Sequence, residues 1–285
     1  MDARIDRVQV VVSDAASAAG AWQRLLGAET LREDTVKALG ARRRVLTLGE
    51  SEIELLAPDG AGPATEFLSA TGGGLFAAGI GVADPQALRA RLAARDVVAA
   101  HEGDQLLLSP EALGIAGLRI VISPLADRRP VGRARFLYEV THLCDDPQRA
   151  VRRFAELFDL DSAHFVPIRS DPFGYEGTLT IFHPDRLDRL EIIRPFDAAK
   201  TMGRFHVRRG DCLYMAYAES DDPAAIRAQC VASAPHDWTG PRDAAVPDNL
   251  FLHPRALGGM MLGVSRTSFA WTWSGHPDWV RPAPR

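Results

Sequence analysis

The fold is decided by the stretch RVQVVVSD at residues 7–14 and by three later stretches that repeat its spacing. In each stretch an apolar run leads to an aspartate seven residues after a fixed position. The fixed positions and their aspartates are Arg7 and Asp14, Ala77 and Asp84, Glu139 and Asp146, and Met215 and Asp222. An aspartate after a strand favours a helix start, because its side chain can cap the free N–H groups of the first turn. One spacing found four times predicts four copies of a strand–helix unit.

Strand-like runs follow each predicted helix and complete the repeat. They lie at residues 44–48 and 52–56 in the first copy, and at 164–168, 177–182 and 190–193 in the third. Each copy therefore has the pattern βαβββ. A helix covers one face of such a unit, so the other face needs a partner. We predict an α+β fold in which four βαβββ modules pair into two curved mixed sheets with the helices outside.

A polar stretch with proline and glycine, residues 126–133, lies between the second and third copies. We therefore expect an N-terminal pair of modules at residues 1–126 and a C-terminal pair at 134–285, the latter with a tryptophan-rich extension. In that extension Phe269, Trp271 and Trp273 alternate, as the buried face of a strand would.

Charge and composition exclude several classes of partner. The chain has 285 residues, 46% of them hydrophobic, and a net charge of −4 without a basic stripe, so we expect no nucleic-acid partner. No apolar run reaches about 18 residues, and the N-terminus has no signal-peptide pattern. Three widely spaced cysteines do not form a disulfide framework. We expect a cytoplasmic monomer or homodimer whose partner is a small molecule.

The tandem units, together with the strand sequence IELLAP at residues 53–58, resemble the vicinal oxygen chelate superfamily. This superfamily includes glyoxalase I, methylmalonyl-CoA epimerase, bleomycin-resistance proteins and extradiol dioxygenases. The resemblance covers residues 4–266 and implies a cup in each paired sheet, with a divalent metal held by His, Glu or Gln on first and last strands. The matching positions here are Arg7, Ala77, Glu139 and Met215, and Glu54, Ile120 or Val121, Glu191 and about Gly263. None is a histidine, so the metal site is atypical or absent.

In the N-terminal half the expected cup positions include Arg7 and Glu54. A guanidinium repels a divalent metal, and a single carboxylate does not hold one alone. First and last strands of a unit are neighbours, so we expect Arg7 and Glu54 to form a charge-assisted pair. The pair either is structural or helps to bind an anionic substrate.

In the C-terminal half Glu139 and Glu191 are expected to point into one cup from adjacent strands. Two close carboxylates in a partly dry cavity can share a proton, bind a cation, or be neutralised by a basic side chain. The first outcome gives an acid/base pair, the second a weak oxygen-rich metal site, and the third a structural contact with Arg189, Arg194 or a histidine. The cofactor is therefore none or one weakly bound divalent metal in this half.

Four further residues are candidates for the same site. Met215 and Tyr217 share a strand face, which predicts an apolar wall, and His206 lies in a connector that approaches the cup. His253 precedes a proline near a last strand and is expected at the rim, where it would assist Glu139 and Glu191 in catalysis. His142 falls on the opposite strand face from Glu139, so we expect a buried histidine there rather than a ligand.

We therefore expect an enzyme of the lyase or isomerase type that acts on a small carbonyl-bearing or aromatic molecule. One alternative is a metal-free protein that binds or sequesters a small molecule. Another is a divergent extradiol-type dioxygenase, which the module count resembles, although Met215 and Gly263 replace expected metal ligands.

Overall fold

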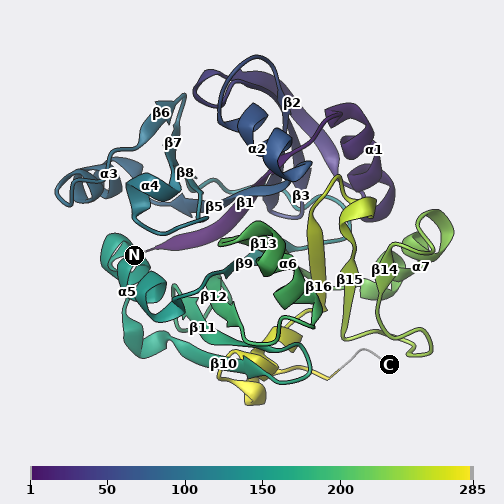
Figure 1. Cartoon of the computed structure of the whole chain (residues 1–285). Coiled ribbons are helices and arrows are strands. Elements are labelled where there is room, and N and C mark those ends of the chain that lie inside the picture. The colour runs from purple at the N-terminus through teal and green to yellow at the C-terminus, as the bar shows by residue number, and fades with distance from the viewer. Residues whose placement is uncertain (1, 283–285) are drawn as a thin grey trace. The chain divides into compact units, whose positions relative to one another are not determined.

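The computed structural model describes residues 2–282 and contains two eight-stranded mixed sheets (Figure 1). The strands of the first sheet are β1 (Ala3–Val11), β2 (Glu29–Val36), β3 (Ala41–Leu48), β4 (Ser51–Pro58), β5 (Gly74–Val82), β6 (Ala100–Glu102), β7 (Gln105–Leu108) and β8 (Ile120–Pro124). Their order is β2-β3-β4-β1-β5-β8-β7-β6. Within a module, β1 and β4 run parallel whereas β3 and β4 run antiparallel.

The second sheet repeats this arrangement. Its strands are β9 (Phe136–Leu143), β10 (Val166–Ser170), β11 (Tyr175–Ile181), β12 (Arg189–Pro195), β13 (Cys212–Ser220), β14 (Trp238–Thr239), β15 (Asn249–Leu252) and β16 (Met261–Arg266). Their order is β10-β11-β12-β9-β13-β16-β15-β14. Two curved mixed sheets of paired βαβββ modules, with helices outside, confirm the predicted fold class.

The four repeated aspartates cap the four module helices, as predicted. Each accepts hydrogen bonds from backbone N–H groups of the first turn, and proline occupies the first helical position in the last three. These helices are α1 (Ala15–Leu26), α3 (Pro85–Ala93), α5 (Pro147–Phe158) and α7 (Pro223–Ser233). The capping therefore turns the chain from each first strand into its covering helix.

The connecting helices are shorter than the longest module helices. They are α2 (Pro63–Thr71), α4 (Pro110–Leu113) and α6 (Thr201–Arg209), with the 3-10 helices η1 (Lys37–Leu39), η2 (Ser162–His164), η3 (Pro254–Ala256), η4 (Phe269–Trp273) and η5 (Pro277–Trp279). Across residues 2–282 no helix has the length and apolar character needed to cross a bilayer.

The predicted strand at Phe269, Trp271 and Trp273 is wrong, because these residues form the 3-10 helix η4. Ser268 has φ 65°, a left-handed conformation that turns the chain out of β16 just before the aromatic residues. Aromatic residues at alternate positions over five residues fit both a strand face and a short helix, so alternation alone could not separate them.

The described chain forms two compact units. The first unit comprises residues up to Ile5, Ala77–Leu125 and Glu139–Tyr214, and the second comprises Asp6–Phe76, Ala126–Tyr138 and the described residues from Met215 onward. The predicted division at residues 126–134 falls between β8 and β9, and it stays a prediction.

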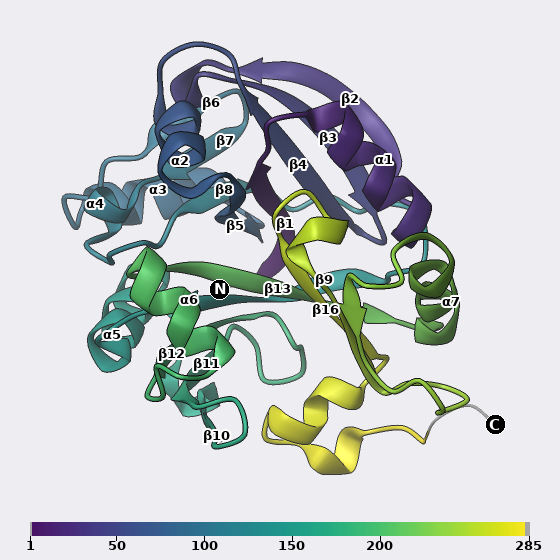
Figure 2. The same ribbon diagram turned by 45° about the vertical axis from the view of Figure 1, so that its right-hand side comes forward.

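Each unit has helices packed on its strands. In the first unit α5 contacts β11 and β12, and its Phe154, Leu157 and Phe158 are fully buried. In the second unit α1 contacts β3 and β4, as Figure 2 shows, and its Trp22 is fully buried. These apolar contacts leave the other face of the strands for polar side chains.

Candidate functional site

The predicted contact of Arg7 with Glu54 is confirmed, and it belongs to a buried ionic network in the second unit. Arg7 Nη1 donates to Glu54 Oε1 at 2.8 Å and to Glu52 Oε2 at 2.9 Å. The parallel pairing of β1 with β4 sets Arg7 opposite Glu52 and Gln9 opposite Glu54. Because side chains on alternate residues share a face, these four residues lie on one side of the strands.

The network extends to arginines from other segments. Arg43 of β3 donates to Glu54 Oε2 at 3.2 Å and to Asp34, and Arg128 donates to Glu52 Oε1 at 3.1 Å and to Asp6. The described contacts join four guanidinium groups with four carboxylates, namely Arg7, Arg32, Arg43 and Arg128 with Asp6, Asp34, Glu52 and Glu54. The charges therefore balance.

This balance fixes the ionisation of Glu54, which is fully buried. Burial on its own raises the pKa of a carboxyl, but Arg7, Arg43 and the amide of Gln9 stabilise the carboxylate and lower the pKa of Glu54 below its usual value. Gln9 Nε2 contributes a hydrogen bond of 2.8 Å. Glu54 is therefore an ionised structural group at neutral pH.

The corresponding strands of the first unit bring Glu139 and Glu191 together, as predicted, but with a different set of partners. Arg189 Nε donates to Glu139 Oε2 at 2.6 Å, and the Thr141 hydroxyl donates to Glu191 Oε2 at 2.6 Å. Parallel pairing sets Glu139 opposite Arg189 and Thr141 opposite Glu191. A side-chain hydrogen bond also joins Tyr175 to Glu191.

Two buried carboxyls in this cluster face one guanidinium. Burial raises the pKa of Glu139 despite its pairing with Arg189. Burial and the nearby Glu139 raise the pKa of Glu191 to about 8, although its hydrogen bonds and Arg189 act in the opposite direction. Because Arg189 donates directly to Glu139, the shared proton resides on Glu191. The cluster of Glu139, Thr141, Tyr175, Arg189 and Glu191 is called the C-terminal carboxyl cluster below.

One difference between the two sites lies on the neighbouring strand. Arg43 pairs with Leu56, two residues after Glu54, and Gly177 pairs with Ile193, two residues after Glu191. Gly177 therefore stands where the first sheet has the second arginine. A Cβ at Gly177 would approach the Ile192 carbonyl oxygen to 2.2 Å, so no larger side chain fits. This explains why Glu191 has no counterpart to the Arg43 contact.

Neither site fits the divalent metal that the resemblance implies. Glu54 and Glu139 each accept a hydrogen bond from a guanidinium. A divalent cation at either carboxylate would therefore lie beside a like charge. Glu191 holds a proton at neutral pH, which further weakens it as a metal ligand. The expected metal ligation by Glu139 and Glu191 is thus a poor match to the donor set.

Met215, Tyr217 and His253 belong to the second unit. Met215 is buried on β13, and Tyr217 packs against Gly263, Phe251 and Trp273. Trp273 in turn contacts Phe269. Tyr217, Phe251, Phe269 and Trp273 are all half-buried, and they form what is called the aromatic wall below. His253 Nε2 lies 3.4 Å from Thr239 Oγ1, within reach of a long hydrogen bond.

The two remaining histidines of interest lie in the first unit. His142 is fully buried, and its Nε2 contacts the Ala116 carbonyl oxygen at 2.9 Å, in line with the expected buried histidine. His206 lies on α6 and its Nε2 is 3.1 Å from Asp211 Oδ1. His206 therefore has an acidic partner on the connector that precedes β13.

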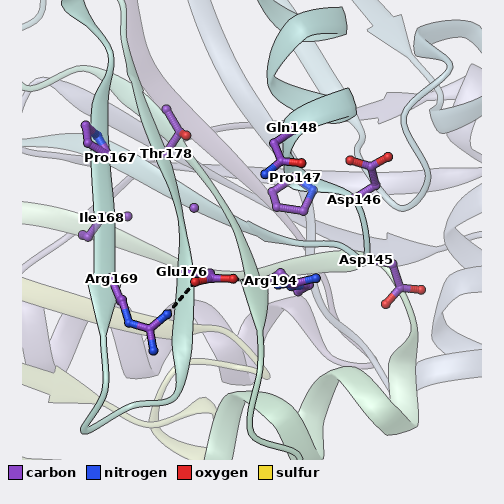
Figure 3. Close-up of a pocket in the computed structure, with 11 residues that line it drawn as sticks. Asp145, Asp146, Pro147, Gln148, Pro167, Ile168, Arg169, Glu176, Thr178 and Arg194 are labelled. Atoms are coloured by element: carbon purple, nitrogen blue, oxygen red, sulfur yellow. Dashed lines mark hydrogen bonds and ion pairs between the residues drawn. The ribbon is translucent and has the colours of Figure 1, made fainter.

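A cavity of about 700 Å³ in the first unit lies beside the start of α5 (Figure 3). It is lined by Asp145, Asp146, Pro147, Gln148, Pro167, Ile168, Arg169, Glu176, Gly177, Thr178 and Arg194. Glu176 accepts from Arg169 and Arg194 at 2.6 Å each. A smaller cavity of about 450 Å³ lies at the same place of the first module, beside the start of α1. The cavity is therefore a notch that the βαβββ module itself creates.

Residues 4–105 match the sequence model of the Glyoxalase/Bleomycin resistance protein/Dioxygenase superfamily. This part of the chain contains the first module and its Arg7 network strands, so the N-terminal part of the chain is similar in sequence to that superfamily. No curated protein matches the sequence.

Two solved structures share the fold of this chain. A triple mutant of 4-hydroxymandelate synthase from Streptomyces coelicolor covers 92% of this chain and 92% of its own, with 16% identity and a TM-score of 0.66. A xylose isomerase-like TIM barrel/4-hydroxyphenylpyruvate dioxygenase fusion protein covers 92% of this chain and 48% of its own, with 15% identity and a TM-score of 0.61. At these identities the likeness establishes the fold alone.

Proposed function

We propose that the protein is an enzyme that transfers a proton on a small carbonyl-bearing or aromatic molecule, with Glu191 as the acid/base group. The observation that supports this is the charge count of the C-terminal carboxyl cluster, two buried carboxyls with one guanidinium. Glu191, the carboxyl without a guanidinium partner, therefore keeps its proton at neutral pH. A group whose pKa lies near the working pH is best suited to general acid–base catalysis.

The rest of the cluster orients Glu191. The Thr141 hydroxyl fixes one carboxyl oxygen at 2.6 Å, and Tyr175 adds a second hydrogen bond. Glu139 supplies the negative charge that helps to raise the pKa of Glu191, and Arg189 holds Glu139 in place. Tyr175 is half-buried, so one edge of the cluster borders on accessible space. Thr141, Tyr175, Glu139 and Arg189 are thus positioning residues in this mechanism.

The chemistry requires an acidic C–H next to a carbonyl, or another group that a base of pKa about 8 can deprotonate. An isomerase or lyase reaction begins with such a step. The dioxygenase alternative has less support, because Met215 and Gly263 occupy expected ligand positions and Glu139 is bound by Arg189.

The test uses 4-hydroxyphenylpyruvate, the compound in the name of a protein with the same fold. Its methylene protons adjoin a carbonyl, so proton transfer is visible as deuterium incorporation by NMR in D₂O. We expect exchange faster than in buffer, and a loss of about 100-fold in that acceleration for Glu191→Gln. Glu176→Gln, on an exposed face of β11, is the control and should exchange like the wild type. An equal rate for wild type and Glu191→Gln would contradict the proposal.

A second candidate function is the metal-free binding of a small aromatic molecule, and the aromatic wall favours it. Half-buried rings at centroid distances of 5.7–6.3 Å offer faces and edges on which a planar ligand can stack. Titration with 4-hydroxymandelate, followed by tryptophan fluorescence, tests this function. Saturable binding that Trp273→Leu weakens, without any exchange catalysed by Glu191, would favour binding over catalysis.

A further inference from the structure

We propose that Asp145, His206 and Asp211 form a binding site for a divalent transition-metal cation, outside the strand positions where the fold family places its metal. One ligand atom from each of these residues lies within 4.8 Å of the others. His206 Nε2 is 3.1 Å from Asp211 Oδ1 and 3.8 Å from Asp145 Oδ1. All three residues belong to the first unit.

The backbone holds the three ligands in place. The Asp145 N–H donates to Asp211 Oδ1 at 3.1 Å, which links the end of β9 to the connector before β13. Gly117 (φ 69°) packs against that connector so closely that a Cβ would lie 1.8 Å from the Asp211 carbonyl oxygen. His206 is on the last turn of α6 and its side chain is 12% exposed. Asp211 and His206 are therefore preorganised, and exposed Asp145 completes the set.

Electrostatics at the site favour a cation. Two carboxylates converge on one imidazole, and their negative charges repel each other. A neutral imidazole relieves none of this repulsion. A divalent ion would neutralise both carboxylates and accept the Nε2 lone pair, and one imidazole with two carboxylates is a donor set used for zinc and its neighbours.

A second buried imidazole lies within electrostatic reach of the same cluster. His142 is fully buried, and its Nδ1 has no hydrogen-bond partner among residues 2–282. A buried polar atom without a partner costs free energy and calls for an explanation. An ion or its bound water beside Asp211 would place an additional polar partner in this region.

The ion would also lie where molecules in the cavity beside α5 can reach it. Asp145 lines the cavity beside α5, and Figure 3 shows its carboxylate at the cavity edge, apart from the Arg169–Glu176 pair. Three protein ligands leave a fourth tetrahedral position for water or a ligand oxygen. Among residues 2–282, Asp145, His206 and Asp211 are the one group of three such side chains close enough to hold a metal ion.

Equilibrium dialysis of the full-length protein against ZnCl₂ tests the site. We expect one zinc per chain, and an affinity at least about tenfold lower for His206→Gln and for Asp211→Asn. His164→Gln is the matched control, because His164 pairs with a single exposed carboxylate, Asp161. Asp145→Asn removes a ligand whose side chain is exposed, so this variant should fold. It tests the site even if the His206 and Asp211 variants do not fold.

Absence of stoichiometric zinc, or equal affinity in wild type, Asp145→Asn and Asp211→Asn, would overturn the proposal. In that case His206 serves only as a hydrogen-bond partner of Asp211. Glu191→Gln should bind zinc like the wild type, so this result is independent of the proton-transfer function.

Discussion

The Arg7 network and the C-terminal carboxyl cluster occupy equivalent places in the first and third modules and differ in charge. Register sets Arg7 opposite Glu52 in one and Glu139 opposite Arg189 in the other, so the same ion pair is present with its two ends exchanged. The next pair, Gln9 with Glu54 and Thr141 with Glu191, keeps the glutamate in both. Arg43 neutralises Glu54, whereas Gly177 leaves Glu191 without that charge. Direct contacts with Arg7 and Arg43 thus keep Glu54 ionised, and Glu191 has neither.

The largest effect is expected from Arg189→Met. Arg189 is fully buried and is the cation that contacts Glu139, so its removal leaves a buried carboxylate without a partner. We expect a loss of about 3–5 kcal/mol in the free energy of unfolding, measured by urea denaturation at pH 7. The double variant Glu139→Met/Arg189→Met should recover most of it. A loss below about 1 kcal/mol in the single variant would show that the ion pair with Arg189 is not needed to stabilise buried Glu139.

Opposite responses to pH are expected from Glu191→Gln and Glu54→Gln. Glu191 has a folded-state pKa of about 8, above its unfolded value of 4.5, so it favours folding below pH 4.5 and this contribution is lost as pH rises through 8. Glu191→Gln should therefore stabilise the protein at pH 8.5, on the order of 2 kcal/mol. Thermal unfolding between pH 5 and 9 measures the change.

The contribution of Glu54 to stability changes with pH in the opposite direction. Its folded-state pKa is lowered, so its contribution is present above the unfolded pKa and is lost as pH falls. Glu54→Gln should cost about 2 kcal/mol at pH 7, with a smaller cost in acid. The comparison fails if both variants shift stability in the same direction at pH 8.5.

Arg43 and Arg44 are adjacent on β3 and point to opposite faces. Arg43 is buried in the network, whereas Arg44 pairs with exposed Glu33. We expect Arg43→Met to destabilise by about 2 kcal/mol and Arg44→Met by less than about 0.5 kcal/mol. Urea denaturation measures the free energy of unfolding of both variants. Similar losses in the two would mean that Arg43 is not needed to neutralise Glu54.

Among substitutions within the two clusters, the smallest effect is expected from Tyr175→Phe. The Tyr175 hydroxyl stabilises the Glu191 carboxylate by a hydrogen bond, so its removal should raise the pKa of Glu191 further. The carboxyl band of Glu191 in infrared difference spectra should titrate at a higher pH than in the wild type, with a stability loss of about 1 kcal/mol. A titration unchanged in position would show that the hydroxyl does not control the proton.

The repeat and its capping aspartates could be predicted from the sequence because both are local patterns with a fixed spacing. Arg7 and Glu54, and Glu139 and Glu191, could be placed on one face because strand alternation and first-to-last pairing follow from the module. Arg43 and Gly177 were missed because their effect depends on the register of a third strand, which turn lengths alone do not fix. Glu52 and Arg189 carried a readable signal, since each precedes a predicted glutamate by two residues.

The cluster of Asp145, His206 and Asp211 lay beyond sequence reasoning for another reason. His206 and Asp211 are close along the chain, but Asp145 is joined to them by a backbone hydrogen bond that spans 66 residues. The sequence places His206 in a connector, from which we expect it near the cup, whereas in the structure it lies on α6 with its Nε2 3.1 Å from Asp211 Oδ1. Long-range contacts of this kind depend on how helices pack on a sheet.

Carrying the modules on one polypeptide has a consequence for what each can become. In a homodimer of identical modules, a substitution appears in every copy, so an exchange such as arginine for glutamate changes all equivalent places together. Here the modules lie on one chain, so a substitution in one module leaves the others unchanged. One copy can keep an interior in which every acid is paired with an arginine, while another carries an acid without such a partner at the matching place.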